Sequence, residues 1–212
     1  MFADQTWLAR AIWLALGVLA LGALAQGRLE LGFVALGTLA LSVAPVFVAR
    51  WADVYVPPSF IVAMTLFIGA TLILGEVFGF YDRFWWWDIV MHATSSIGFG
   101  MTGFVLVFMM FQGDRYAAPP VAVAFFAFCF AVFIGTAWEI FEYSMDQLFG
   151  FNMQKSGLPD TMGDLIVDMA GALVGAATGF AYLKGQARGG LAALIDEFVR
   201  RNPRFFRRLR HK

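Results

Sequence analysis

The 212-residue sequence has little charge and a single cysteine. Only 14% of its residues are charged and 60% are hydrophobic, whereas soluble domains are about a quarter charged and about half apolar. This composition excludes an ordinary soluble domain and predicts an integral membrane protein. Cys129 stands alone, which excludes a disulfide framework within one chain. It lies in an apolar run and is expected to be a small residue of the core. The formal net charge is zero, so nothing favours a nucleic-acid partner.

Six apolar runs are long enough to cross a bilayer as helices rather than as barrel strands. They are expected at 8–25, 31–49, 59–79, 88–111, 119–145 and 161–183. The first run ends in Ala23-Leu24-Ala25, which resembles a signal-peptidase site, but the weak positive charge before it favours a retained span. The predicted fold is an all-α membrane protein. A six-helix transmembrane bundle over 1–186 would be followed by a basic amphipathic tail over 187–212.

The distribution of basic residues predicts the orientation. Nine of the fifteen Lys and Arg residues follow the sixth run, and positively charged flanks stay in the cytoplasm. An even number of spans then places both termini in the cytoplasm. We expect the arginines of the tail to meet anionic head groups of membrane lipids and to serve mainly as a topology anchor.

Ionisable residues gather at one end of the last three spans. They are Asp88 and His92 in the fourth span, Glu139 and Glu142 in the fifth, and Asp160, Asp164 and Asp168 in the sixth. Within each span the spacing is three or four residues, which places the side chains on one helical face. At about 1.5 Å per residue, His92, Glu139 and Asp164 reach a similar depth, roughly 6–9 Å inside the outer boundary. Three helices therefore predict one shared polar cluster that faces outward.

Simpler roles are open for some of these residues. Asp88 fits a helix N-cap, and Asp164 fits the last position of a capping box that starts at Thr161. His92, Glu139 and Asp168 are flanked by apolar residues, and the last three spans contain no Lys or Arg. Ionisable residues inside a membrane are functional candidates by default.

Three interpretations of this cluster are open: a network of protonated carboxyl groups, a metal site, and polar packing with a structural role only. The carboxyl groups could hold protons, because desolvation disfavours their charged form. A divalent cation such as Zn, Mn, Fe or Mg could instead supply the missing positive charge. The candidate metal ligands are Asp88, His92, Glu139, Glu142 and Asp164, and the candidate catalytic residues are Glu139 and Asp168.

Three motifs, "WDIVMHATSSIG", "WEIFEY" and "DTMGDLIVDMAGALVGA", resemble the YjdF-like family of uncharacterised bacterial inner-membrane proteins. More distantly they resemble VanZ-like proteins, which are linked to glycopeptide resistance. The resemblance covers about residues 85–176 and implies site positions at Asp88, His92, Glu139, Glu142, Asp164 and Asp168. It implies no established reaction.

Three functions fit these observations. An enzyme could use the cluster for hydrolysis or group transfer on a lipid or envelope precursor. A transporter could use the same residues as a proton or cation relay. In a non-catalytic scaffold, the important residues would be Gly171, Gly175 and Gly179. They form GxxxG patterns typical of close helix packing within the chain or in a homo-oligomer.

Overall fold

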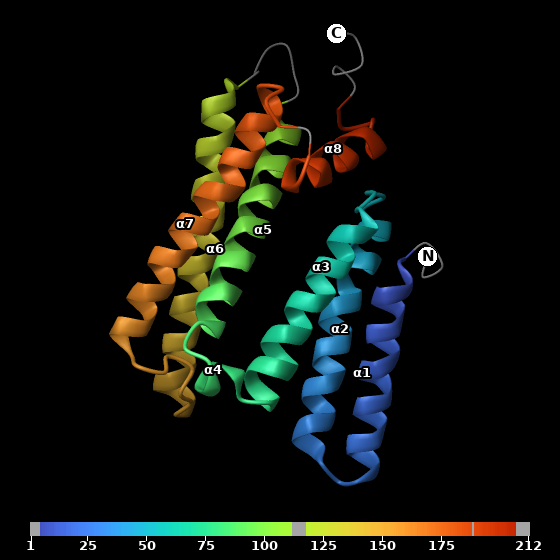
Figure 1. Ribbon diagram of the computed structural model, residues 1–212, viewed down its shortest axis with the longest axis vertical. Helices are drawn as coiled ribbons and strands as arrows, with labels where there is room; N and C mark the ends of the chain where they lie inside the picture. Colours follow the sequence, from blue (N-terminus) through green and yellow to red (C-terminus); the bar gives the residue numbers. More distant parts are fainter. Residues whose placement is uncertain (1–4, 112–117, 188, 207–212) are drawn as a thin grey trace. The chain divides into compact units, whose positions relative to one another are not determined.

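The computed structural model describes residues 5–111, 118–187 and 189–206, and in these residues the chain forms helices and no strands. Six helical segments are long and apolar enough to cross a membrane. They are α1 (Trp7–Ala25), α2 (Leu29–Trp51), α3 with the π-helix η1 (Pro58–Val77 together), α5 (Trp87–Met110), α6 (Pro120–Phe149) and α7 (Leu158–Leu183) (Figure 1). The predicted all-α class and the six predicted spans are confirmed.

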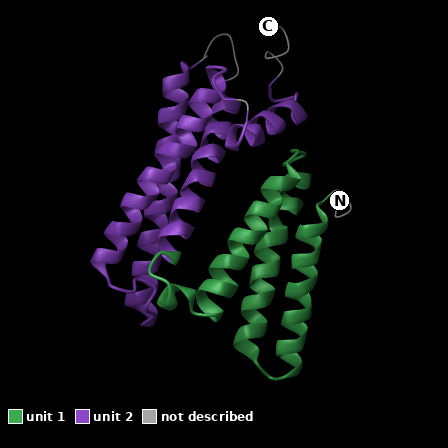
Figure 2. Ribbon diagram, viewed as in Figure 1, with its two compact units in different colours: residues 1–87 green, residues 88–212 purple. Residues whose placement is uncertain are grey.

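The chain divides into two compact units, residues 1–87 and 88–212 (Figure 2). The first unit contains α1, α2, α3 (Pro58–Gly69), η1 (Ala70–Val77) and the short α4 (Phe80–Arg83). Helix α1 begins after Thr6, whose hydroxyl accepts a hydrogen bond from the Ala9 amide. Side chains of α1, α2 and α3 bury one of its two cores, formed by Ala9, Trp13, Val46 and Ile61. The first span is therefore a packed part of this unit.

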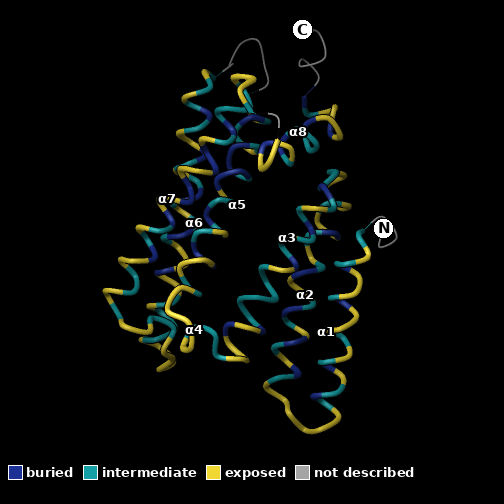
Figure 3. Tube along the Cα trace, viewed as in Figure 1, coloured by how far each residue is buried: buried dark blue, intermediate teal, exposed yellow. Residues whose placement is uncertain are grey.

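The second unit contains α5, α6 and α7 side by side, and α8 (Leu191–Arg201) beside the end of α5. Their buried residues form one apolar core that includes Met101, Phe104, Val123 and Ala127, and the exposed residues lie on the outer faces (Figure 3). Large apolar side chains such as Phe133 are exposed, as expected for helices whose solvent is lipid. Cys129 is also exposed, so its expected place in the core is wrong. It lies on an outward face of α6.

Helices α5 and α7 approach each other closely because glycines face each other at their contact. A Cβ on Gly171 would lie 2.8 Å from the Ala93 carbonyl oxygen, and one on Gly100 would lie 3.0 Å from Gly175 Cα. Gly179 has the ring of Phe104 in the corresponding place. Packing within the chain therefore accounts for the GxxxG patterns, while a homo-oligomer through Gly171, Gly175 and Gly179 stays a prediction.

Helix α8 belongs to the core of the second unit. Its residues Ile195 and Val199, with Phe206 after it, pack against Phe104 and Phe108 of α5. The apolar stripe of α8 is therefore covered by protein. The expected division into 1–186 and 187–212 stays a prediction. The exposed Arg200 pairs with Asp196 at 3.1 Å, and the expected contact of the tail with anionic lipids stays a prediction.

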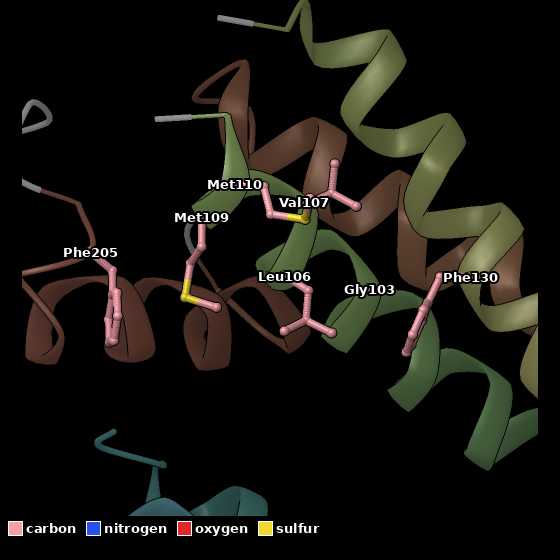
Figure 4. A pocket seen from close by; sticks show the side chains of 7 residues that line it. All are labelled: Gly103, Leu106, Val107, Met109, Met110, Phe130 and Phe205. Carbon is pink, nitrogen blue, oxygen red and sulfur yellow. The ribbon is translucent and has the colours of Figure 1, made fainter. Parts of the chain in front are cut away.

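An open apolar pocket of about 470 Å³ lies beside the same end of α5 (Figure 4). It is lined by Gly103, Leu106, Val107, Met109, Met110, Phe130 and Phe205. No ionisable side chain lines it, and it begins eleven residues beyond His92, about 16 Å along the helix. It is therefore separate from the polar cluster.

Candidate metal centre

Helix α5 places Asp88 in its first turn and His92 in its second. The four-residue spacing brings the two side chains to one face, and Asp88 Oδ1 lies 3.6 Å from His92 Nε2. The helix begins at Trp87, so Asp88 stands inside it rather than at an N-cap. The Asp88 side chain is 29% exposed and the His92 side chain 10%, so the cluster opens on the side of Asp88.

Helices α6 and α7 each bring one buried carboxylate to the same nitrogen. Glu139 Oε1 lies 3.9 Å from His92 Nε2 and Asp164 Oδ1 lies 4.0 Å from it. Oxygens from three helices thus converge on Nε2. The ligand atoms of Asp88, His92 and Asp164 all lie within 4.8 Å of one another. The expected shared cluster is present in the geometry.

The other ring nitrogen of His92, Nδ1, contacts Asp168. His92 Nδ1 lies 3.2 Å from Asp168 Oδ1, and the Ser96 hydroxyl donates to the same oxygen at 2.5 Å. Of the two neighbouring serines of α5, Ser95 and Ser96, it is Ser96 that donates to Asp168. The Ser95 hydroxyl instead donates to the His92 carbonyl oxygen at 2.9 Å.

Gly135 of α6 leaves the space in which the Asp168 carboxylate lies. A Cβ at this position would overlap the carboxylate. Sequence reasoning missed Gly135, although a lone glycine in the apolar run before "TAWEIFEY" is a signal for close approach of another group.

Glu139 is the residue of the cluster whose buried carboxylate lacks hydrogen-bond partners in the part of the chain that the structure describes. It is 3% exposed, and neither of its carboxylate oxygens has a hydrogen-bond partner among the described residues. The Thr161 hydroxyl is near enough to interact with it, but without hydrogen-bond geometry. A buried ionised carboxylate without compensation costs several kcal/mol, so a proton, a cation or a bound water is needed to complete this site.

Glu142 and Asp160 lie at the edge of the cluster and are half-buried. The carboxylate of Glu142 accepts a hydrogen bond from Trp138 Nε1 at 2.9 Å. Among the described residues, four carboxylates lie within 4.0 Å of a His92 nitrogen, and that of Glu142 is not one of them. Glu142 is thus the predicted ligand that the structure does not bring to His92. Asp160 lies in the first turn of α7.

The start of α7 removes one simple explanation of Asp164. The helix begins at Leu158 after Gly157, which has φ 71° and provides no side-chain cap. Thr161 is therefore inside the helix and does not open a capping box with Asp164.

The connection between α6 and α7 is fixed by Asp146, which sequence reasoning also missed. Its carboxylate accepts from the backbone amides of Met153 and Gln154 at 2.7 and 2.9 Å. Gln154 Nε2 in turn donates to Thr161 at 2.5 Å. This connection holds the ends of the two helices that carry Glu139 and Asp164.

Fold and site together define a six-helix membrane protein with one buried imidazole among four carboxylates. Residues 7–185 match the family model described as "Predicted membrane protein (DUF2238)", and the chain belongs to this family. A protein of Thermotoga maritima, described as uncharacterized, is 36% identical over 104 residues. The match covers 47% of this chain and 50% of that protein, so the chain spans about half the length of this relative. No solved structure matches.

Proposed function

We propose that this protein binds a divalent metal ion within the membrane and uses it for hydrolysis or group transfer on a lipid or envelope precursor. The observation that carries the proposal is Glu139, a buried carboxylate with two unpartnered oxygens that faces His92 Nε2. The YjdF-like resemblance agrees with membership of this family of membrane proteins and adds no reaction; the VanZ-like resemblance carries no part of the argument.

The spacing of the donor atoms fits an ion. Three carboxylate oxygens lie 3.6–4.0 Å from His92 Nε2, beyond the distance of an ordinary hydrogen bond. With metal–ligand bonds of about 2.1 Å, neighbouring ligand atoms of a tetrahedral site lie about 3.4 Å apart. The ligand atoms of Asp88, His92 and Asp164 lie within 4.8 Å of one another, so a small inward movement would bring these three onto one ion. Glu139 lies outside this group, 3.9 Å from Nε2, and would join by a further movement of its side chain.

The chemistry of the donors also fits. One imidazole nitrogen with carboxylates from Asp88, Glu139 and Asp164 is a set suited to Zn, Mn, Fe or Mg. Such an ion would supply Lewis acidity and lower the pKa of a bound water. Asp88 is the most exposed of these ligands, so water or substrate would approach from its side. Glu139 would serve as a ligand or as the general base.

The location of the site follows from the topology. Helix α8 packs against the end of α5 that carries Phe104 and Phe108, whereas His92 lies in the second turn at the other end (Figure 1). If the tail lies in the cytoplasm of a bacterium, as its basic residues predict, His92 lies on the outer side of the inner membrane. This is the reason for proposing a lipid or envelope precursor as substrate.

A proton or cation relay is the second candidate. In its favour, Asp88, His92, Asp168 and Ser96 form a continuous series of polar contacts directed into the helices. Beyond Ser96, however, α5 and α7 are in glycine-to-backbone contact and the core is apolar. A relay needs an exit from the far side of Ser96, and the metal proposal does not.

The test is elemental analysis of the purified protein together with its thermal stability before and after chelation. A stoichiometric divalent ion, and a lower Tm after chelation that is restored by the same ion, would support the proposal, because an ion that binds the native state stabilises it by mass action. No ion on purification and no effect of chelator or added Zn²⁺, Mn²⁺, Fe²⁺ or Mg²⁺ would leave the relay in front.

A further inference from the structure

The two nitrogens of His92 have different surroundings. Nδ1 lies 3.2 Å from Asp168 Oδ1, whereas the nearest oxygen to Nε2 is Asp88 Oδ1 at 3.6 Å. A neutral imidazole carries one N–H, and the other nitrogen is the bare one that binds a metal. The position of that proton thus decides which nitrogen of His92 can bind a metal ion.

Asp168 is held so that only Nδ1 has an acceptor within reach. The side chain is 2% exposed, Ser96 donates to Oδ1, and the carboxylate lies over Gly135, where any Cβ would displace it. Because Oδ1 accepts from Ser96, it is the acceptor in its contact with Nδ1 as well, and this contact is made by a proton on Nδ1. The oxygens around Nε2 are too distant to hold a proton on that nitrogen.

We infer that Ser96, Asp168 and Gly135 form a buried support that fixes His92 in the Nδ1–H tautomer and leaves Nε2 bare. Asp168 is then a positioning residue that acts through His92, not a ligand and not a catalytic residue. The consequence for metal binding rests on the proposed function, while the tautomer itself does not. Carboxylate contacts of this kind orient metal-bound histidines and raise their affinity.

The same contacts do not form a nucleophilic serine site. In such a site the imidazole lies between serine and carboxylate, whereas here the carboxylate of Asp168 lies between Ser96 and His92. Ser96 is also 2% exposed and donates a hydrogen bond to the same Asp168 oxygen that contacts His92 Nδ1. Its geometry suits support of Asp168.

The sequence allows a direct measurement, since it contains only two histidines, His92 and His211. In a His211→Gln background, purified with a tag that lacks histidine, ¹⁵N-histidine labelling reports on His92 alone. The spectrum of the chelated protein is recorded at a pH where the ring is neutral. We expect the proton on Nδ1. A proton on Nε2 in this protein would overturn the inference.

Matched variants test the support itself. Asp168→Asn offers an amide that can donate to Nδ1, so we expect the Nε2–H tautomer to appear. Ser96→Ala should give a mixture of tautomers, while Ser95→Ala, which loses only a bond to the backbone of α5, should leave the spectrum unchanged. If Asp168→Asn keeps the proton on Nδ1, or if Ser96→Ala and Ser95→Ala behave alike, the support has no such role.

Affinity for Zn²⁺ supplies the second readout. We expect Asp168→Asn and Ser96→Ala to bind Zn²⁺ about 10–100-fold more weakly than the parent protein, with Ser95→Ala unchanged. Gly135→Ala should weaken binding in the same way, whereas Gly163→Ala, whose Cβ would meet nothing within 4 Å, should not. A parent that binds no Zn²⁺ overturns the metal proposal, and the tautomer then decides the inference alone. A parent that binds Zn²⁺ with unchanged affinity in Asp168→Asn overturns the inference only.

Discussion

At the scale of single residues, three aspartates on one face of α7 have three different surroundings. Asp160 is half-buried at the start of the helix, Asp164 is 5% exposed and faces His92 Nε2, and Asp168 is 2% exposed and contacts Nδ1. Their spacing predicted the shared face. It could not predict which nitrogen of His92 each would meet, because that depends on the rotation of α5.

Asp164→Asn and Asp160→Asn should therefore have unequal effects. Removing the charge at Asp164 deletes a ligand, so the variant should lose its ion and its Tm should no longer respond to chelator. The free energy of unfolding of Asp160→Asn should stay within about 0.5 kcal/mol of that of the parent, as expected for a substitution outside the core and the buried polar contacts. Thermal unfolding of each protein with and without chelator measures both. Equal chelator responses in the parent and Asp164→Asn would contradict the assignment.

Glu139→Gln should raise the Tm of the metal-free protein and lower the Tm of the metal-loaded protein. Without an ion, the substitution removes a buried charge that has no partner and should raise Tm, since uncompensated buried charges cost several kcal/mol. With the ion present it removes a ligand and should lower Tm relative to the loaded parent. The comparison is a melting series for both proteins, chelated and with added Zn²⁺. A variant that is less stable than the parent in both conditions would show that Glu139 has a purely structural partner.

At the scale of the elements, apolar run length predicted the positions of the six spans, because hydropathy over about twenty residues is a property of sequence alone. The ends were less predictable. Helix α6 extends to Phe149 and closes at Gly150 with φ 69°, a left-handed conformation that favours glycine. Helix α7 begins at Leu158, before the predicted 161. Gly135 and Ser96 could not be assigned because their roles depend on contacts between helices far apart in sequence.

The α5–α7 contact makes a prediction at this scale. Gly175→Ala would direct a Cβ at the Ile97 carbonyl oxygen and Gly100 Cα, both backbone atoms that cannot rotate away. We expect a loss of about 1–3 kcal/mol, the usual cost of overpacking. Gly98→Ala, whose Cβ would meet nothing within 4 Å, should be neutral or slightly stabilising. Thermal or denaturant unfolding compares the two, and equal effects would contradict the close contact.

At the scale of the whole molecule, the function depends on which side of the membrane the cluster faces. The distribution of Lys and Arg predicts a cytoplasmic tail, and the fold of the second unit places the cluster at the end of α5 opposite to α8. The two statements together predict that His92 lies outside. If the orientation were reversed, the metal site could persist, but its substrates would be cytoplasmic.

Labelling of single cysteines in intact cells decides this point. The native Cys129 is exposed on α6, so Cys129→Ala provides the background. Asn152→Cys, in the exposed connection before α7 at the end that carries the cluster, should react with a membrane-impermeant maleimide from outside. Gln186→Cys, at the other end of the same helix, should react only after permeabilisation, since Lys184 and the arginines that follow predict a cytoplasmic location for that end. The reverse pattern would contradict the orientation and move the search for a substrate to the cytoplasmic side. It would leave the measurements on His92, Glu139 and Asp164 unaffected, because those residues belong to one unit whichever way it faces.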